Sequence, residues 1–208
     1  MRRKLVAILR GVRPSEVEAI GAALTDAGIT IIEVPLNSPE PFTSIEKLAT
    51  RCGNDALIGA GTVLFAKDVV SVARAGGRLI VSPNCDTHVI AATLRLEMVS
   101  MPGVFTPTEC LAAIGAGARS IKLFPASIAG PDGLKAIRAV LPTDIEVYAV
   151  GGASATNFAR WAEAGAAGFG IGTSLYRPGD DARTVAARAR DIVAAYDAAF
   201  RHEAIVAV

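Results

Sequence analysis

The chain has 208 residues, 51% of them hydrophobic, and a formal net charge of +1. This length fits one domain with a full core, so residues 1–208 are expected to form a single domain. The balanced charge argues against nucleic acid or a membrane surface as a partner, and no apolar run is long enough to span a membrane.

Eight short apolar segments recur along the chain, roughly every 20 to 27 residues, which is the spacing of strand–helix units. The expected strands are residues 5–10, 30–36, 56–59, 79–82, 98–101, 120–124, 146–150 and 168–171. The Ala-rich segments between them are expected to be helices, four of which end in an Ala-Gly pair that closes the helix: Ala27-Gly28, Ala75-Gly76, Ala116-Gly117 and Ala164-Gly165. A last helix is expected to begin at Asp180 or Asp181 and to give way to a tail after Arg201.

Eight consecutive strand–helix units in a chain of this length predict a compact (β/α)8 TIM barrel. The alternative is a doubly wound open sheet, which usually has about five or six strands and a more polar edge strand than any in this sequence. In a barrel the functional site lies at the C-terminal ends of the strands, so the residues at those ends are the candidates for chemistry.

Lys122 lies in the middle of the expected strand 120–124, between Ile121 and Leu123 and two residues before Phe124. Burial disfavours the ammonium form, lowers the pKa of the lysine and makes its amine a nucleophile near neutral pH. A desolvated lysine of this kind attacks a ketone to form a Schiff base. The alternative is a structural lysine that pairs with an acid or extends to the surface.

Glu33 is a second polar residue in an apolar strand. It lies on the same face of the strand as Ile31 and Pro35, opposite to Ile32 and Val34. If that face is the barrel interior, a carboxylate lies near Lys122. A purely structural ion pair is the alternative, but such pairs contribute little net stability because both charges must be desolvated. Glu33 and Lys122 are therefore the predicted catalytic pair.

Further candidates lie at other strand ends. Arg10 can grip a carboxylate with two parallel hydrogen bonds, although a solvated arginine at a strand end is the alternative. Thr62 follows a Gly-x-Gly turn and is a weaker candidate. Loops after the seventh and eighth strands bind phosphate in many barrels, and glycines there let backbone amides approach an anion while hydroxyls add donors. The predicted phosphate-binding residues are Gly151, Gly152, Gly172, Thr173 and Ser174.

The remaining chemistry-bearing residues predict neither a metal nor a nucleotide cofactor. The three cysteines are far apart and form no Cys-x-x-Cys pair, which favours a reducing, cytoplasmic location. His88, expected in a helix, and His202, in the expected tail, are the only histidines and cannot build a Ser-His-Asp set or a metal cluster. No Walker A motif or Gly-x-Gly-x-x-Gly turn after the first strand is present, so no cofactor is expected.

The chain resembles the class I aldolases that cleave 2-keto-3-deoxy-6-phospho sugar acids. The segments that carry this resemblance occur in the family's order and span almost the whole chain: residues 7–11 (AILRG), 32–39 (IEVPLNSP), 58–63 (IGAGTV), 82–84 (SPN), 121–126 (IKLFPA) and 149–152 (AVGG). Their number and order make a chance match improbable.

The resemblance implies roles for individual residues. Lys122, Glu33 and Arg10 fall on the family's Schiff-base, proton-transfer and carboxylate-binding positions, and Thr62 and Gly152 fall on substrate-binding positions. Thr173 stands where a serine is common. The resemblance also implies a homotrimer whose substrate is a small phosphorylated 2-keto-3-deoxy sugar acid, with pyruvate as one product.

The resemblance further distinguishes two branches of the family. Asn37 and Val150 replace the arginine and threonine that are typical of the gluconate-type enzymes, which indicates the galactonate-type branch and a place in galactose or galactonate catabolism. A gluconate-type aldolase is the nearest alternative. A phosphosugar isomerase on the same barrel, or a phosphate-ligand binding protein without catalysis, are the others.

Overall fold

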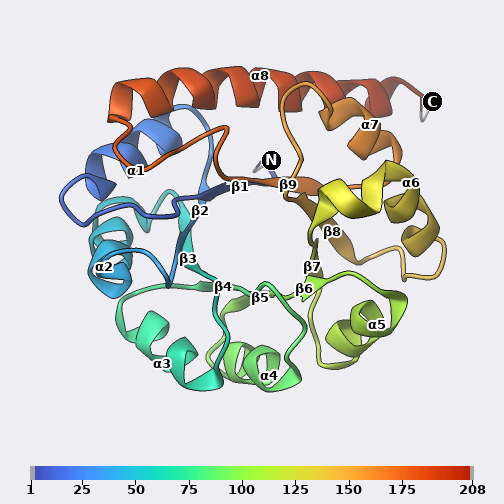
Figure 1. Ribbon diagram of the computed structural model, residues 1–208, viewed down its shortest axis with the longest axis horizontal. Helices are drawn as coiled ribbons and strands as arrows, with labels where there is room; N and C mark the ends of the chain where they lie inside the picture. Colours follow the sequence, from blue (N-terminus) through green and yellow to red (C-terminus); the bar gives the residue numbers. More distant parts are fainter. Residues whose placement is uncertain (1–2, 207–208) are drawn as a thin grey trace.

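The computed structural model describes residues 3–206, with side chains as far as residue 201. Residues 1–2 and 207–208, at the ends of the predicted 1–208 domain, lie outside the described residues. A ring of parallel strands forms the centre and helices surround it (Figure 1). The strands are β1 (Leu5–Ile8), β2 (Ile31–Pro35), β3 (Leu57–Gly61), β4 (Leu79–Val81), β5 (Val99–Met101), β6 (Gly103–Val104), β7 (Ser120–Leu123), β8 (Glu146–Val150) and β9 (Gly168–Ile171). The helices are α1 (Val17–Asp26), α2 (Pro41–Cys52), α3 (Ala66–Arg74), α4 (Thr87–Arg95), α5 (Pro107–Gly115), α6 (Ala126–Arg138), α7 (Phe158–Glu163) and α8 (Ala182–Val206).

The sheet has the order β5-β4-β3-β2-β1-β9-β8-β7-β6, which is a nearly closed barrel and confirms the predicted TIM-barrel class. The structure has nine strands where eight were expected. The additional strand is β6, which follows β5 in the region of the expected strand 98–101 and is separated from it by Pro102, a residue without an N–H to donate. β5 pairs with β4, and β6 pairs with β7. The amide of Lys122 donates to the carbonyl of Pro102 at 2.8 Å, so the ring is continued across the interruption.

Side chains of each strand alternate between two apolar layers. On β1, Leu5 and Ala7 pack in the layer beneath the helices, whereas Val6 and Ile8 belong to the smaller cluster inside the barrel. On β9 the inward positions are Gly168 and Gly170, where a Cβ would meet Tyr148 and Val150 respectively. Atoms of Lys4 and Tyr148 fill the space beside Gly168, and the side chain of Val150 fills the space beside Gly170.

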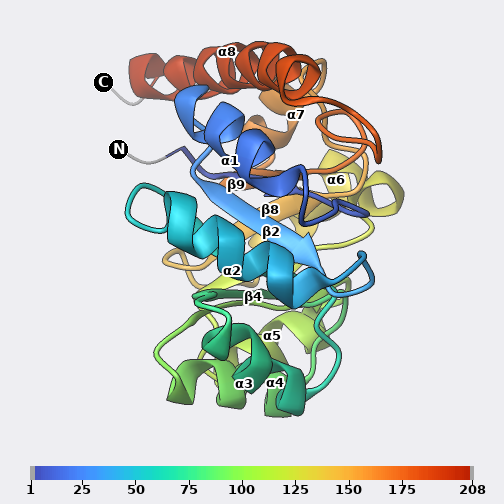
Figure 2. The same ribbon diagram turned by 90° about the vertical axis from the view of Figure 1, so that its left-hand side faces the viewer.

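The long helix α8 lies across the outside of the barrel beside α1 and α7 (Figures 1 and 2). The side chain of Asp181 accepts a hydrogen bond from the amide of Thr184 at 2.8 Å and marks the predicted start of the helix. The predicted tail after Arg201 is wrong, because the helix continues to Val206 through a segment without glycine or proline. At the other end of the sequence, Arg3 forms an ion pair with Asp197 of α8 at 2.7 Å.

Two other local predictions are confirmed. The four Ala-Gly pairs close α1, α3, α5 and α7, and each glycine has a positive φ, between 81° at Gly76 and 102° at Gly117. His88 lies in α4, as expected. Within residues 3–206, no helix combines the length and the apolar character that crossing a membrane requires.

Candidate active site

Lys122 projects from the centre of β7 into the barrel. Its neighbours Ile121 and Leu123 pack in the outer layer, so alternation turns Lys122 inward, and only 7% of the residue is exposed. Its Nζ lies 4.6 Å from the centre of the Phe124 ring. Burial lowers the pKa of Lys122 below its usual 10.5, and the charge of Arg10 adds to this lowering while Glu33 opposes it. The amine is therefore more available as a nucleophile than that of a lysine in water.

Glu33 projects inward from β2 and is 2% exposed. Among the described residues its Oε2 is buried and has no hydrogen-bond partner. Burial raises the pKa of Glu33 from 4.5 to about 7, although the positive charges of Lys122 and Arg10 oppose the rise. A carboxyl group with a pKa near neutrality can both accept and return a proton at physiological pH.

Arg10 is held at the end of β1 by two neighbouring strand ends. Its Nη1 donates to Oδ1 of Asn37 at 2.5 Å, and its Nη2 donates to Oγ1 of Thr62 at 3.3 Å. The following residue, Gly11, donates its amide to the hydroxyl of Ser38 at 2.9 Å. These contacts orient the guanidinium while leaving N–H groups for a carboxylate ligand.

The β8–α7 loop carries Gly151 and Gly152, whose φ angles of 82° and 103° are disfavoured for residues with a side chain. The carbonyl of Gly151 accepts from the amide of Ser127 at 2.6 Å, and the carbonyl of Gly152 accepts from Nδ2 of Asn157 at 2.9 Å. Both carbonyl oxygens are thereby engaged by the surrounding scaffold, which fixes the two peptide units at the barrel mouth.

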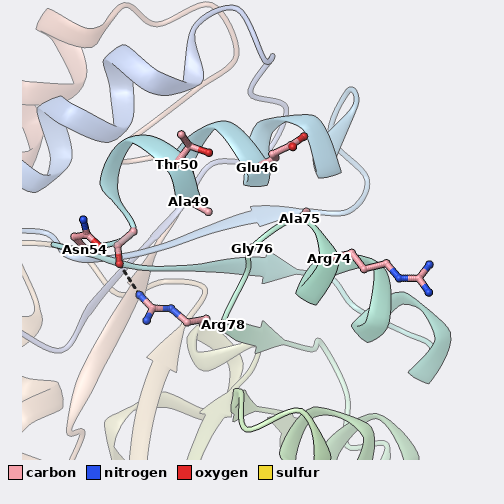
Figure 3. Close-up of a pocket in the computed structure, with 9 residues that line it drawn as sticks. Glu46, Ala49, Thr50, Asn54, Arg74, Ala75, Gly76 and Arg78 are labelled. Carbon is pink, nitrogen blue, oxygen red and sulfur yellow. Dashed lines mark hydrogen bonds between the residues drawn. The ribbon is translucent and has the colours of Figure 1, made fainter.

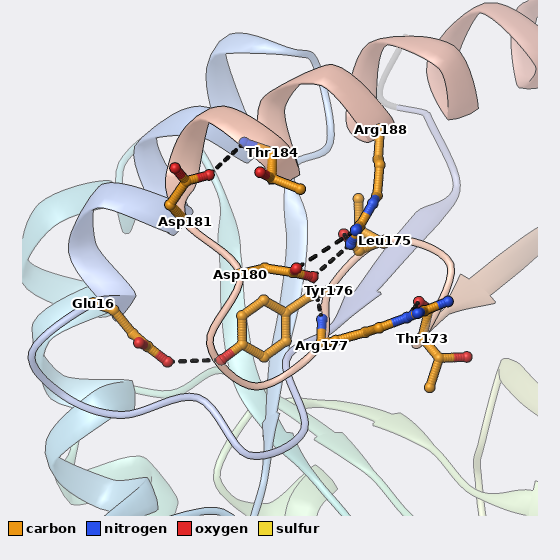
Figure 4. A network of polar contacts seen from close by, with 9 residues as sticks. All are labelled: Glu16, Thr173, Leu175, Tyr176, Arg177, Asp180, Asp181, Thr184 and Arg188. Carbon is orange, nitrogen blue, oxygen red and sulfur yellow. Dashed lines mark hydrogen bonds and ion pairs between the residues drawn. The ribbon is translucent and has the colours of Figure 1, made fainter.

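The β9–α8 loop carries Thr173 and is fastened at several points (Figure 4). The guanidinium of Arg177 donates through Nε to the carbonyl of Thr173 at 3.1 Å. Tyr176 donates its hydroxyl to Glu16 at 2.7 Å, and Arg188 pairs with Asp180 at 2.5 Å. The loop is therefore tied to the start of α1 and to the first turns of α8.

These groups line one cavity of about 410 Å³ at the C-terminal ends of the strands. It brings together all nine residues predicted from the sequence: Arg10, Glu33, Thr62, Lys122, Gly151, Gly152, Gly172, Thr173 and Ser174. Six lining residues were not predicted: Ile8, Pro83, Phe124, Val150, Ala153 and Gly170. All of these except Pro83 stand two residues from a predicted one at the same strand end, so strand alternation is the signal that would have found most of them.

A second hollow, of about 430 Å³, lies between the C-terminal ends of α2 and α3 (Figure 3). Arg78, which lines it, donates to the carbonyl of Gly53 at 2.5 Å. Its charged lining residues are exposed and none resembles the buried pair in the barrel. Among the described residues, no group of three or more His, Cys, Asp or Glu side chains could hold a metal ion.

Comparison with known proteins gives a consistent result. Residues 1–186 match the family model of the KDPG and KHG aldolases. The chain is 54% identical over 200 residues to the probable 2-dehydro-3-deoxy-6-phosphogalactonate aldolase of Rhizobium meliloti (strain 1021), and this match covers 96% of the chain and 94% of that protein. It is 46% identical over 192 residues to the 2-dehydro-3-deoxy-6-phosphogalactonate aldolase of Escherichia coli (strain K12), which covers 92% of the chain and 94% of that protein. A solved native KDPGal structure superposes with a TM-score of 0.95 at 45% identity, covering 97% of this chain and 98% of that one.

Proposed function

The chain belongs to the KDPG and KHG aldolase family, and we propose that it cleaves 2-dehydro-3-deoxy-6-phosphogalactonate to pyruvate and D-glyceraldehyde 3-phosphate through a Schiff base. The observation that carries this proposal is the presence of Lys122 and Glu33, both buried, on one cavity. A binding protein without catalysis has no use for two desolvated charges of this kind, and family membership favours an aldolase over a phosphosugar isomerase.

Lys122 is the proposed nucleophile. Its amine attacks the C2 ketone of the substrate, and loss of water gives an iminium ion. The iminium draws electrons from the neighbouring C3–C4 bond and supplies the electron sink that the cleavage requires. The burial that lowers the pKa of Lys122 is what makes the free amine available for the first step.

Glu33 is the proposed proton carrier. It removes the proton of the C4 hydroxyl, directly or through a water molecule, and the C3–C4 bond breaks to release glyceraldehyde 3-phosphate and an enamine of pyruvate. Glu33 then returns a proton to C3, and water hydrolyses the iminium to free pyruvate. Its raised pKa suits a group that must take and give the same proton.

The other cavity residues are proposed to hold the two anionic ends of the substrate. Arg10, oriented by Asn37 and Thr62, binds the carboxylate at C1. The loops that carry Gly151, Gly152, Gly172, Thr173 and Ser174 bind the phosphate with backbone amides and hydroxyls. Anchoring both ends positions the bond to be broken.

The nearest alternative is cleavage of the gluconate epimer at C4. Steady-state kinetics on both epimers test the choice, and we expect the larger kcat/KM for the galactonate compound. A larger kcat/KM for the gluconate compound would assign the chain to the other branch.

We also propose that residues 1–208 form one domain that assembles as a homotrimer in the cytoplasm, where a phosphorylated sugar acid would be its substrate. Exposed apolar side chains near the barrel mouth, Leu64 and Phe65 between β3 and α3, support association between copies. Sedimentation equilibrium of the wild-type protein and of Phe65→Asp tests the assembly, and a monomeric wild-type protein would contradict it.

A further inference from the structure

Gly61 is the last residue of β3, and its missing side chain leaves a space that another residue fills. A Cβ built on Gly61 would overlap Cδ and both carboxylate oxygens of Glu33. These three atoms are the nearest neighbours that such a Cβ would meet. The carboxyl group of Glu33 therefore lies where any other residue at position 61 would place its first side-chain atom.

The backbone of Gly61 does not itself require glycine. Gly61 is absent from the residues with positive φ, in contrast to Gly151 and Gly152, so its conformation is open to residues with a side chain. Gly59, two residues earlier on the same strand, differs again, because a Cβ there would overlap the backbone of Leu79. At Gly61 all three of the nearest atoms belong to one side chain, that of Glu33.

Among the described residues, one oxygen of the Glu33 carboxyl group lacks the hydrogen bond that usually helps to fix a buried carboxylate. This oxygen is Oε2, which is buried. Packing therefore helps to set the direction of this side chain, and the carboxyl group rests against the bare backbone of Gly61.

We propose that Gly61 is a positioning residue for the reaction: its missing Cβ creates the slot that holds the Glu33 carboxyl against β3 and aims it into the cavity shared with Lys122. The inference rests on the proton-carrier role proposed for Glu33. A side chain at position 61 would push the carboxyl group out of the slot by about one atom's width, and displacements of about 1 Å can slow catalysis about 100-fold.

A double-mutant cycle tests the proposal with Gly61→Ala, Glu33→Ala, the double variant and the wild type. The readouts are kcat for cleavage and the rate at which the methyl protons of pyruvate exchange with D2O. This exchange requires the Schiff base and proton transfer at C3 but no cleavage of the C3–C4 bond. We expect Gly61→Ala to lower both rates about 100-fold, and to change them less than about twofold in the Glu33→Ala background. End-point trapping of pyruvate by borohydride on Lys122 should persist in Gly61→Ala. Gly115→Ala is the matched control, because a Cβ there meets nothing within 4 Å.

Each outcome decides. Wild-type rates in Gly61→Ala, or losses that multiply in the double variant, would overturn the proposal. If Gly61→Ala does not fold alone but folds together with Glu33→Ala, the conflict with Glu33 is demonstrated and the proposal is supported. If neither Gly61→Ala nor the double variant folds, the conflict lies with residues other than Glu33 and the proposal is refuted. Wild-type turnover in Glu33→Ala would refute the proton-carrier role itself, a result distinct from a failure at Gly61 alone.

Discussion

Replacing Glu33 by glutamine should slow turnover and yet stabilise the protein increasingly as the pH rises. Glu33 is 2% exposed, and burial raises its pKa from 4.5 to about 7. Between these two pH values the unfolded chain has lost the proton that the folded chain retains. The folded state then binds more protons than the unfolded state, so the contribution of Glu33 to stability falls as the pH rises through this window.

The size of the effect follows from the two pKa values. Below pH 4.5 the carboxyl group is protonated in both states and costs nothing through ionisation. Well above pH 7 the full difference between the two pKa values applies, and at about 1.4 kcal/mol per pH unit it amounts to about 3.5 kcal/mol. Between pH 5 and pH 8 the stability advantage of Glu33→Gln over the wild type should therefore grow by about 2.5 kcal/mol.

Urea denaturation of both proteins at pH 5 and pH 8 measures this change. The amide of glutamine is also a buried polar group, but its cost is the same at both pH values and cancels from the comparison. Glu46→Gln, which changes an exposed glutamate of α2, is the control and should show no comparable growth. A pH-independent difference between Glu33→Gln and the wild type would refute the view that Glu33 is held in a desolvated slot.

Two further substitutions have outcomes that the structure defines. Arg10→Lys should raise KM about 10-fold or more while changing kcat less, because an ammonium cannot contact Asn37 and also grip a carboxylate with two parallel hydrogen bonds; unchanged KM in steady-state kinetics would argue against the carboxylate site. Thr106→Ala should lower the free energy of unfolding by about 1 kcal/mol and leave kcat unchanged, because it removes the capping box that Thr106 forms with Glu109 at the start of α5. Equal urea midpoints for Thr106→Ala and the wild type would show that this cap contributes nothing.

Strand alternation made much of the site predictable from the sequence. Lys122 and Glu33 each interrupt an apolar strand, and period 2 places both on the inner face once the strand is identified. The same rule extends to Phe124 and Ile8, which line the cavity two residues from a predicted group. The glycine loops were predictable because barrel topology fixes which strand ends meet.

Other features depend on distances that sequence patterns do not contain. The additional strand β6, directly after Pro102, depends on its pairing with β7, whereas β5 pairs with β4. The contact of Arg10 with Asn37 joins residues 27 positions apart and depends on how two strand ends lie side by side. From the sequence, Gly61 is interpreted only as part of a Gly-x-Gly turn. The structure shows that its missing side chain leaves room for the Glu33 carboxyl group.

The most direct test of the proposed chemistry is reduction with borohydride in the presence of pyruvate, followed by peptide mass spectrometry. A Schiff base on Lys122 predicts one stoichiometric adduct on the peptide that contains this residue, lost in Lys122→Arg and retained in Lys135→Arg. An adduct on another lysine, or full aldolase turnover in Lys122→Arg, would contradict the account.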